Sequence, residues 1–210
     1  MAKQAQKFTT KSGILLGPAR IEFPFIYETN KDEEFGRDRY MATFRAKKDE
    51  AGLKSHAKLE KEAKALWAAN FPGEEFAPGR LPWTDGDVKA KEIITKGSKP
   101  GGDREAAEKK AGFVRGSYEI KATSNAKNKP SLYGYKPLGE DGTTKAPLGE
   151  QTIDMGDVVR FWVTLGIYLD KKTGDPCMTC YLEGVQLISK GRQGNACTED
   201  ESMDEEEAIF

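Results

Sequence analysis

The segment 157–169 constrains the fold most, because its side chains alternate in character along its whole length. One face carries Asp157, Val159, Phe161, Val163, Leu165, Ile167 and Leu169, of which all but the first are apolar. The other face carries Val158, Arg160, Trp162, Thr164, Gly166 and Tyr168. A period of two residues is that of a β-strand with one buried face. The segment therefore predicts a long strand against a hydrophobic core.

Other segments show the same alternation, over 13–27, 38–46, 113–123, 131–136 and 177–189. In the first of these, Ala19, Ile21, Phe23, Phe25 and Tyr27 share a face and alternate with Arg20, Glu22 and Pro24. Because proline cannot donate to a strand ladder, Pro18 and Pro24 predict an edge strand or a bulged one. In 38–46, Tyr40, Ala42, Phe44 and Ala46 share one face, while Arg39, Met41, Thr43 and Arg45 share the other.

Two segments have helical character. Over 49–70, Leu59, Ala63, Leu66 and Trp67 lie at helical spacing, and Pro72 follows. A loop-rich segment over 71–102 precedes a short helix over 103–111, with Asp103 as its N-cap and Gly112 at its end. Strands that do not alternate with helices favour a mainly β fold. We predict a small closed or nearly closed β-barrel of about six strands with one long and one short inserted helix.

The charge is divided unevenly along the chain. The last twelve residues hold seven of the 34 acidic side chains and no Lys or Arg, so the other residues carry 33 basic against 27 acidic side chains. A basic body suits a polyanionic ligand, and an acidic tail can compete for the same surface. We expect one domain over 1–190 and a disordered acidic tail over 191–210.

The sequence lacks the marks of a membrane or secreted protein. No apolar run approaches the length of a membrane span. The segment 1–13 is polar and lacks the apolar stretch of a secretory signal. Three cysteines, Cys177, Cys180 and Cys197, are an odd number in a chain that is large enough to form a core without disulfides. We interpret them as reduced thiols in a cytoplasm and expect no cofactor.

Aromatic and basic side chains predicted to point away from the core form a candidate nucleic-acid surface. The predicted contacts are Arg39, Arg45, Arg115, Lys121, Tyr133, Tyr135, Arg160, Trp162, Tyr168, Lys171 and Lys172. Aromatic rings can stack on any base, and Lys or Arg neutralise phosphates. The alternative is that these rings pack beneath the long helix or between two copies of the chain.

The acidic tail ends in two large apolar residues, Ile209 and Phe210. A tail that only increases solubility gains nothing from them. A ligand for a shallow pocket does, because the ring can be buried while the terminal carboxylate meets a basic residue. We predict that Ile209 and Phe210 bind a partner protein.

An acidic tail that closes on an apolar residue and Phe210 resembles the tails of bacterial and phage replicative single-stranded DNA-binding proteins. The layout of the chain is similar to an OB-fold group of tailed-phage proteins with this function. The similarity rests on Gly17-Pro18, Phe23-Pro24, a helix after the second strand, the segment 81–87, the late strands and the tail.

The resemblance implies single-stranded DNA binding in phage replication or recombination, inside an infected bacterial cell. It also implies that the tail recruits replication proteins and occupies the DNA groove when DNA is absent. Two features depart from the pattern. The tail ends in Ile209-Phe210 where bacterial tails have Pro-Phe, and the long helix follows the second strand, whereas that of a standard OB-fold follows the third.

Parts of the sequence are also compatible with other functions. A DNA-annealing recombination protein would share the basic and aromatic surface, and a pure protein-interaction module would have no affinity for DNA. Asp85 and Asp87 could hold Mg²⁺ in a nuclease, although Asp-Gly is also a strong turn signal. A zinc site needs four ligands, and beyond Cys177 and Cys180 the sequence supplies only Cys197 and His56; positions three apart in a strand also face opposite ways. The single histidine, His56, lies on the apolar stripe of the long helix. We therefore predict a protein without catalytic residues.

Overall fold

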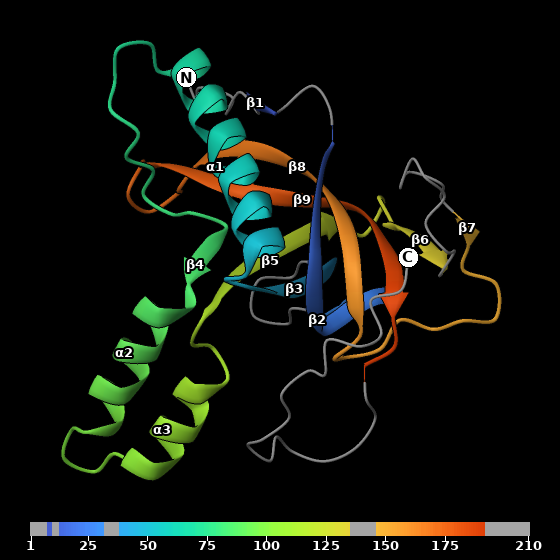
Figure 1. The fold of residues 1–210 in the computed structure, drawn as a ribbon. Coiled ribbons are helices and arrows are strands. Elements are labelled where there is room, and N and C mark those ends of the chain that lie inside the picture. Colours follow the sequence, from blue (N-terminus) through green and yellow to red (C-terminus); the bar gives the residue numbers. More distant parts are fainter. Residues whose placement is uncertain (1–7, 10–12, 32–37, 135–145, 192–210) are drawn as a thin grey trace.

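Five strands of the chain close into a β-barrel, and helices are inserted between them (Figure 1). The computed structural model describes residues 8–9, 13–31, 38–134 and 146–191. In chain order the elements are β1 (Phe8–Thr9), β2 (Ile14–Asn30), β3 (Arg39–Lys47), α1 (Glu50–Asn70), β4 (Trp83–Asp85), α2 (Gly86–Gly97), α3 (Arg104–Gly112), β5 (Ser117–Asn125), β6 (Ser131–Gly134), β7 (Ala146–Pro147), β8 (Val158–Leu169) and β9 (Pro176–Ser189). None of the helices in these ranges is long and apolar enough to span a membrane.

The barrel strands are paired in the order β8–β2–β3–β5–β9, and β9 pairs with β8 to close the ring. All of these pairs are antiparallel except β5–β9, which is parallel. The first barrel strand thus pairs with the second and fourth, and the third runs parallel to the fifth, which is the strand order of the OB-fold. The predicted OB-fold-like barrel is confirmed.

Helix α1 packs its apolar side into the barrel core. Asp49 is its N-cap, and the Asp49 side chain accepts a hydrogen bond from the Gly52 amide at 2.8 Å. Leu59, Ala63 and Trp67 are buried in the same hydrophobic cluster as the strand side chains. The predicted long helix is confirmed, and it lies between the second and third barrel strands, where the sequence places it.

Helices α2 and α3 lie side by side and project from the barrel (Figure 1). The loop-rich assignment of 71–102 is wrong in part, because α2 lies within it. Asp85 is the N-cap of α2, and its carboxylate accepts a hydrogen bond from the Asp87 amide at 2.8 Å. A Cβ at Gly86 would collide with the Val114 carbonyl oxygen, so glycine is required for this close approach. The Asp-Gly pair starts a helix here.

The predicted short helix over 103–111 is confirmed as α3, with Asp103 as its N-cap. The chain then makes a turn over 113–116, so β5 begins at Ser117 and not at residue 113, as the alternation predicted. Arg115 consequently lies in this turn and is exposed.

Strand β2 carries a bulge that turns its aromatic residues outward. Its pairing with β3 shifts register just before Phe25. Ile21 and Ile26 are both fully buried, although an odd number of positions separates them and a regular strand would place them on opposite faces. Phe23, Phe25 and Tyr27 are 61%, 37% and 40% exposed. The alternation placed them on one face with Ile21, whereas in the structure Ile21 is buried and they are exposed.

Strand β8 buries the face that the sequence predicts. Val159, Phe161 and Val163 are fully buried. The Phe161 ring stacks on Phe44 of β3, with centroids 3.7 Å apart and planes 2° apart. Leu169, predicted on this face, is 50% exposed, because it is the last residue before the β8–β9 turn.

Candidate nucleic-acid interface

The first candidate surface is the outer face of the sheet formed by β2, β3 and β5, which we call the β2–β3–β5 face. Ala42 and Phe44 of β3 point into the core, so the side chains that alternate with them point outward. Pairing aligns the outward residues in four rows: Arg20–Arg45–Glu119, Glu22–Thr43–Lys121, Phe25–Met41–Thr123 and Asn30–Arg39–Asn125. OB-folds bind oligonucleotides on the face of their second and third strands, which are β3 and β5 here.

Two exposed phenylalanines lie on β2. Phe25 is paired with Met41 in the third row, and Phe23 lies in the register shift between Glu22 and Phe25, with a left-handed backbone conformation (φ 48°). A bulky residue rarely adopts this conformation, and it is held here with a side chain that remains largely in solvent. The alternation alone does not single out Phe23 or Phe25. The feature that indicates their outward position is Pro24, which predicts a bulge between Ile21 and Ile26, the two isoleucines that the structure buries.

A network of charges holds cations at one end of the face. The buried Glu119 carboxylate receives Lys89 Nζ at 2.5 Å. Arg45 Nη2 and Lys121 Nζ each lie 3.6 Å from it, and Arg45 also pairs with Glu22 at 2.8 Å. Burial opposes ionisation of Glu119, but the hydrogen bond from Lys89 and the charges of Lys121 and Arg45 lower its pKa below the ordinary value. Burial raises the pKa of Glu22.

The predicted cations of this face differ in what they can offer a ligand. The Lys121 side chain is 63% exposed. Arg39 is half-buried in the row between Asn30 and Asn125. Arg45 is engaged within the protein, since it also donates a hydrogen bond to the Phe113 carbonyl oxygen at 2.8 Å.

A second surface, the outer face of β8, β9 and β6, carries other predicted residues, and we call it the β8–β9 face. Trp162 of β8 meets Tyr133 of β6 edge to face, with ring centroids 5.6 Å apart. Both rings lie over Gly184, where an added Cβ would come within 3.4 Å of Tyr133 and 3.5 Å of Trp162. Arg160 lies on the same face, paired with Gln186 of β9.

The barrel separates these two faces. Strand β3 neighbours only β2 and β5, so β8 and β9 lie across the barrel from it. The structure therefore does not bring the predicted residues into one groove. Arg39, Arg45 and Lys121 lie on the β2–β3–β5 face, and Tyr133, Arg160 and Trp162 lie on the β8–β9 face.

The remaining predicted residues lie in turns or beyond the described chain. Lys171 and Lys172 are exposed in the turn between β8 and β9, where the sequence predicts a hairpin loop. Tyr168 is half-buried before this turn, and its burial, with the nearby Cys177, raises the pKa of the phenol. Tyr135, Ile209 and Phe210 lie outside the described residues, as do Cys197 and the acidic tail.

The two carboxylates considered for a magnesium site bind a lysine. Lys48 Nζ lies 2.7 Å from Asp85 Oδ1 and 2.5 Å from Asp87 Oδ2. Asp87 also accepts a hydrogen bond from the Gly116 amide at 2.9 Å. These contacts lower the pKa of both carboxyl groups and neutralise much of the charge that would attract a cation. The pair anchors the start of α2 to the end of β3 and does not favour a nuclease.

The cysteine and histidine considered for metal binding or catalysis are packed against other side chains in the structure. Cys180 lies in the hydrophobic core, and burial raises the pKa of its thiol. Within the described ranges there is no cluster of three metal-binding side chains. The His56 ring stacks on Tyr118, with centroids 3.8 Å apart, and meets Trp83 edge to face; burial lowers its pKa.

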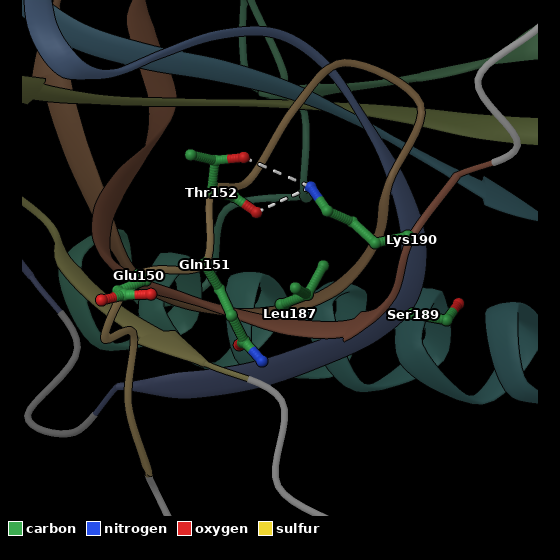
Figure 2. A pocket seen from close by; sticks show the side chains of 6 residues that line it. All are labelled: Glu150, Gln151, Thr152, Leu187, Ser189 and Lys190. Carbon is green, nitrogen blue, oxygen red and sulfur yellow. Dashed lines mark hydrogen bonds between the residues drawn. The ribbon is translucent and has the colours of Figure 1, made fainter.

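A cavity of about 440 Å³ lies beside the end of β9, and Figure 2 shows its lining. Lys190 points across it and donates hydrogen bonds to the carbonyl oxygen of Thr152 at 2.8 Å and to its hydroxyl oxygen at 3.4 Å (Figure 2). The same ammonium group lies 2.7 Å from Asp154 and 2.9 Å from Asp157. Because this cation is already neutralised by carboxylates, the cavity does not favour an anionic ligand.

Comparison with known proteins identifies the fold class. No family model matches the chain, and no curated protein sequence matches it. Among solved structures, the chain is similar to single-stranded DNA-binding proteins from bacteriophages.

Three solved structures from two bacteriophages match most of the chain at low sequence identity. The C-terminal truncation of the single-stranded DNA-binding protein from bacteriophage Enc34 matches with a TM-score of 0.54 and 17% identity, over 90% of this chain and 97% of that one. The same protein in complex with ssDNA matches with a TM-score of 0.51 and 18% identity, over 85% and 86%. Gp2.5 of bacteriophage T7 matches with a TM-score of 0.46 and 14% identity, over 92% and 91%. The two Enc34 matches show a shared fold.

Proposed function

We propose that the chain binds single-stranded DNA on the β2–β3–β5 face and has no catalytic activity. The observation that carries the proposal is the exposure of Phe23 and Phe25 on an OB-like barrel, beside Lys121 and Arg39. Exposed rings stack on bases of any sequence, and the cations neutralise phosphates. The similarity of the fold to the Enc34 protein, which has been solved with ssDNA bound, supports the same ligand.

The four rows of paired residues on the β2–β3–β5 face suggest how the DNA is held. Phe25 and Phe23 supply the stacking surface along β2, while Lys121 and Arg39 lie on the neighbouring strands, where they can reach the backbone of the same DNA strand. Glu119 lies 3.6 Å from both Lys121 and Arg45, so its charge offsets part of their mutual repulsion. Stacking and phosphate contacts both ignore base identity, so the chain would coat DNA and not read its sequence.

The biological role is proposed from the resemblance and the phage origin of the structural neighbours. The chain would protect single strands during phage replication or recombination in an infected bacterial cell. The pairing of Asp85 and Asp87 with Lys48 supports binding over nuclease activity.

The test is the binding of a fluorescently labelled oligothymidine, followed by anisotropy, with duplex DNA of equal length as the comparison. We expect the single strand to bind more tightly than the duplex. If about four phosphates are contacted, affinity should fall about 50-fold as salt rises from about 50 to about 200 mM. Absence of binding to both DNAs would overturn the proposal and favour a protein-interaction module.

The acidic tail is proposed to compete with DNA for this face and to bind a partner through Ile209 and Phe210. Its seven carboxylates match the cations of the face in the way that a polyphosphate does. A chain that ends at Thr198 is expected to bind oligothymidine more tightly in the same anisotropy assay, most of all at low salt, where the tail competes best. Equal affinities of the full and shortened chains would contradict competition by the tail.

A further inference from the structure

The α2–α3 hairpin is a small unit with its own core. Ala90, Ala111 and Val114 are buried together, with Ile93 and Ile94 packed against them. The hairpin adds nothing to the main core of the barrel, from which it projects (Figure 1). Residues 86–116 carry eight basic and five acidic side chains. An arm of this kind, with a basic excess, needs a role other than stabilising the barrel.

An aromatic ring is exposed at the base of this hairpin. Phe113 follows α3 directly and is 45% exposed. Lys109, Lys110 and Arg115 surround it in the chain and are all exposed. A single exposed ring is common on proteins. A ring next to three exposed cations combines the two kinds of side chain with which proteins bind single-stranded DNA.

Contacts fix this turn next to the β2–β3–β5 face. Arg45, in the first row of the face, donates a hydrogen bond to the Phe113 carbonyl oxygen at 2.8 Å. Lys89 of α2 binds Glu119 of the same row at 2.5 Å. On the far side of the turn, the Gly116 carbonyl oxygen accepts from the Lys48 amide at 2.8 Å. The turn is therefore continuous with the face and held in place from both sides.

We propose that the α3–β5 turn is a second contact site for the DNA strand that leaves the β2–β3–β5 face. Phe113 stacks on a base, while Lys109, Lys110 and Arg115 bind phosphates. The inference rests on the proposed function. It extends that function because it says where the DNA strand runs after it leaves the barrel. The occupant is single-stranded DNA, since the site is cationic and adjoins the proposed interface through Arg45 and Glu119. An acidic peptide would meet the cations but would leave the ring without a base to stack on.

The test compares oligothymidines of about 6 and about 20 nucleotides; one OB-fold holds about 4 to 16, so only the longer one extends past the barrel. Phe113→Ala is expected to weaken binding of the long oligonucleotide by about 5- to 100-fold and to leave the short one unchanged. Arg115→Glu should act in the same direction. Leu53→Ala and Lys61→Glu are the matched controls, because both residues are exposed on α1, and they should change neither affinity.

The outcomes separate this inference from the proposed function. Unchanged binding of the short oligonucleotide shows that the variants are folded. If Phe113→Ala leaves both affinities unchanged, or lowers both equally, the second contact site is wrong while DNA binding by the barrel stands. If the unmodified chain binds the long and short oligonucleotides with equal affinity, the second contact site is also wrong. If it binds neither, the proposed function fails together with it.

Discussion

Replacing Phe23 and Phe25 together by alanine is expected to weaken binding of oligothymidine by about 30-fold or more. Each lost stack between a ring and a base costs about 1–3 kcal/mol. The two side chains are 61% and 37% exposed, so their removal should leave little unfavourable cavity. The measurement is anisotropy with labelled oligothymidine, with thermal unfolding of both proteins as the check on folding.

The comparison variant removes the rings of the other face. Tyr133→Ala with Trp162→Ala deletes the pair that lies over Gly184. We expect this double variant to bind oligothymidine more tightly than the Phe23 and Phe25 variant does. The reverse order, with binding lost only when Tyr133 and Trp162 are removed, would place the interface on the β8–β9 face.

Phe161→Ala is expected to lower the free energy of unfolding by about 3–5 kcal/mol, the usual cost of removing a buried phenylalanine. Phe161 is fully buried and stacks on Phe44, so its removal leaves a cavity between β8 and β3, on opposite walls of the barrel. Such a loss is a large part of the stability of an ordinary domain. Urea denaturation followed by circular dichroism measures it.

The control for this prediction is Leu53→Ala on α1, where the side chain is 47% exposed. A change at such a surface position should remain within about 0.5 kcal/mol. A loss below about 1 kcal/mol for Phe161→Ala would contradict the packing described for the barrel.

The sequence predicts β8 and α1 correctly because each has a single period and one buried side. Val159, Phe161 and Val163 alternate without interruption, and Leu59, Ala63 and Trp67 recur at helical spacing. A regular period is a local property, so it can be read without knowledge of the partner strands.

The path of β2 could not be predicted in the same way. A bulge adds one residue to one strand, and every side chain after it changes face. Apolar residues occupy both faces here, so the pattern does not show where the change occurs. Pro24 indicates a bulge, but only the pairing with β3 reveals that Ile26 is inside and that Phe23 and Phe25 are outside.

The sequence also could not show that the predicted contact residues lie on two different faces of the barrel. Arg39 and Arg160 are both outward residues of their strands, as the sequence predicts. Which outward residues share a surface depends on non-local pairing, and β3 and β8 are not neighbours in the ring. Similarly, Asp85-Gly86 is typical of a turn, and its role as a helix start depends on distant contacts: Lys48 binds Asp85, and Gly86 packs closely against the Val114 carbonyl oxygen.

The most direct test of the central claim is photocrosslinking of a 5-iodouracil-substituted oligonucleotide to the full chain, followed by mass spectrometry of the crosslinked peptides. The account predicts crosslinks to Phe23 or Phe25 on β2, lost when excess unlabelled oligothymidine competes. Crosslinks confined to Tyr133 and Trp162, or none that competitor removes, would contradict binding of single-stranded DNA on the β2–β3–β5 face.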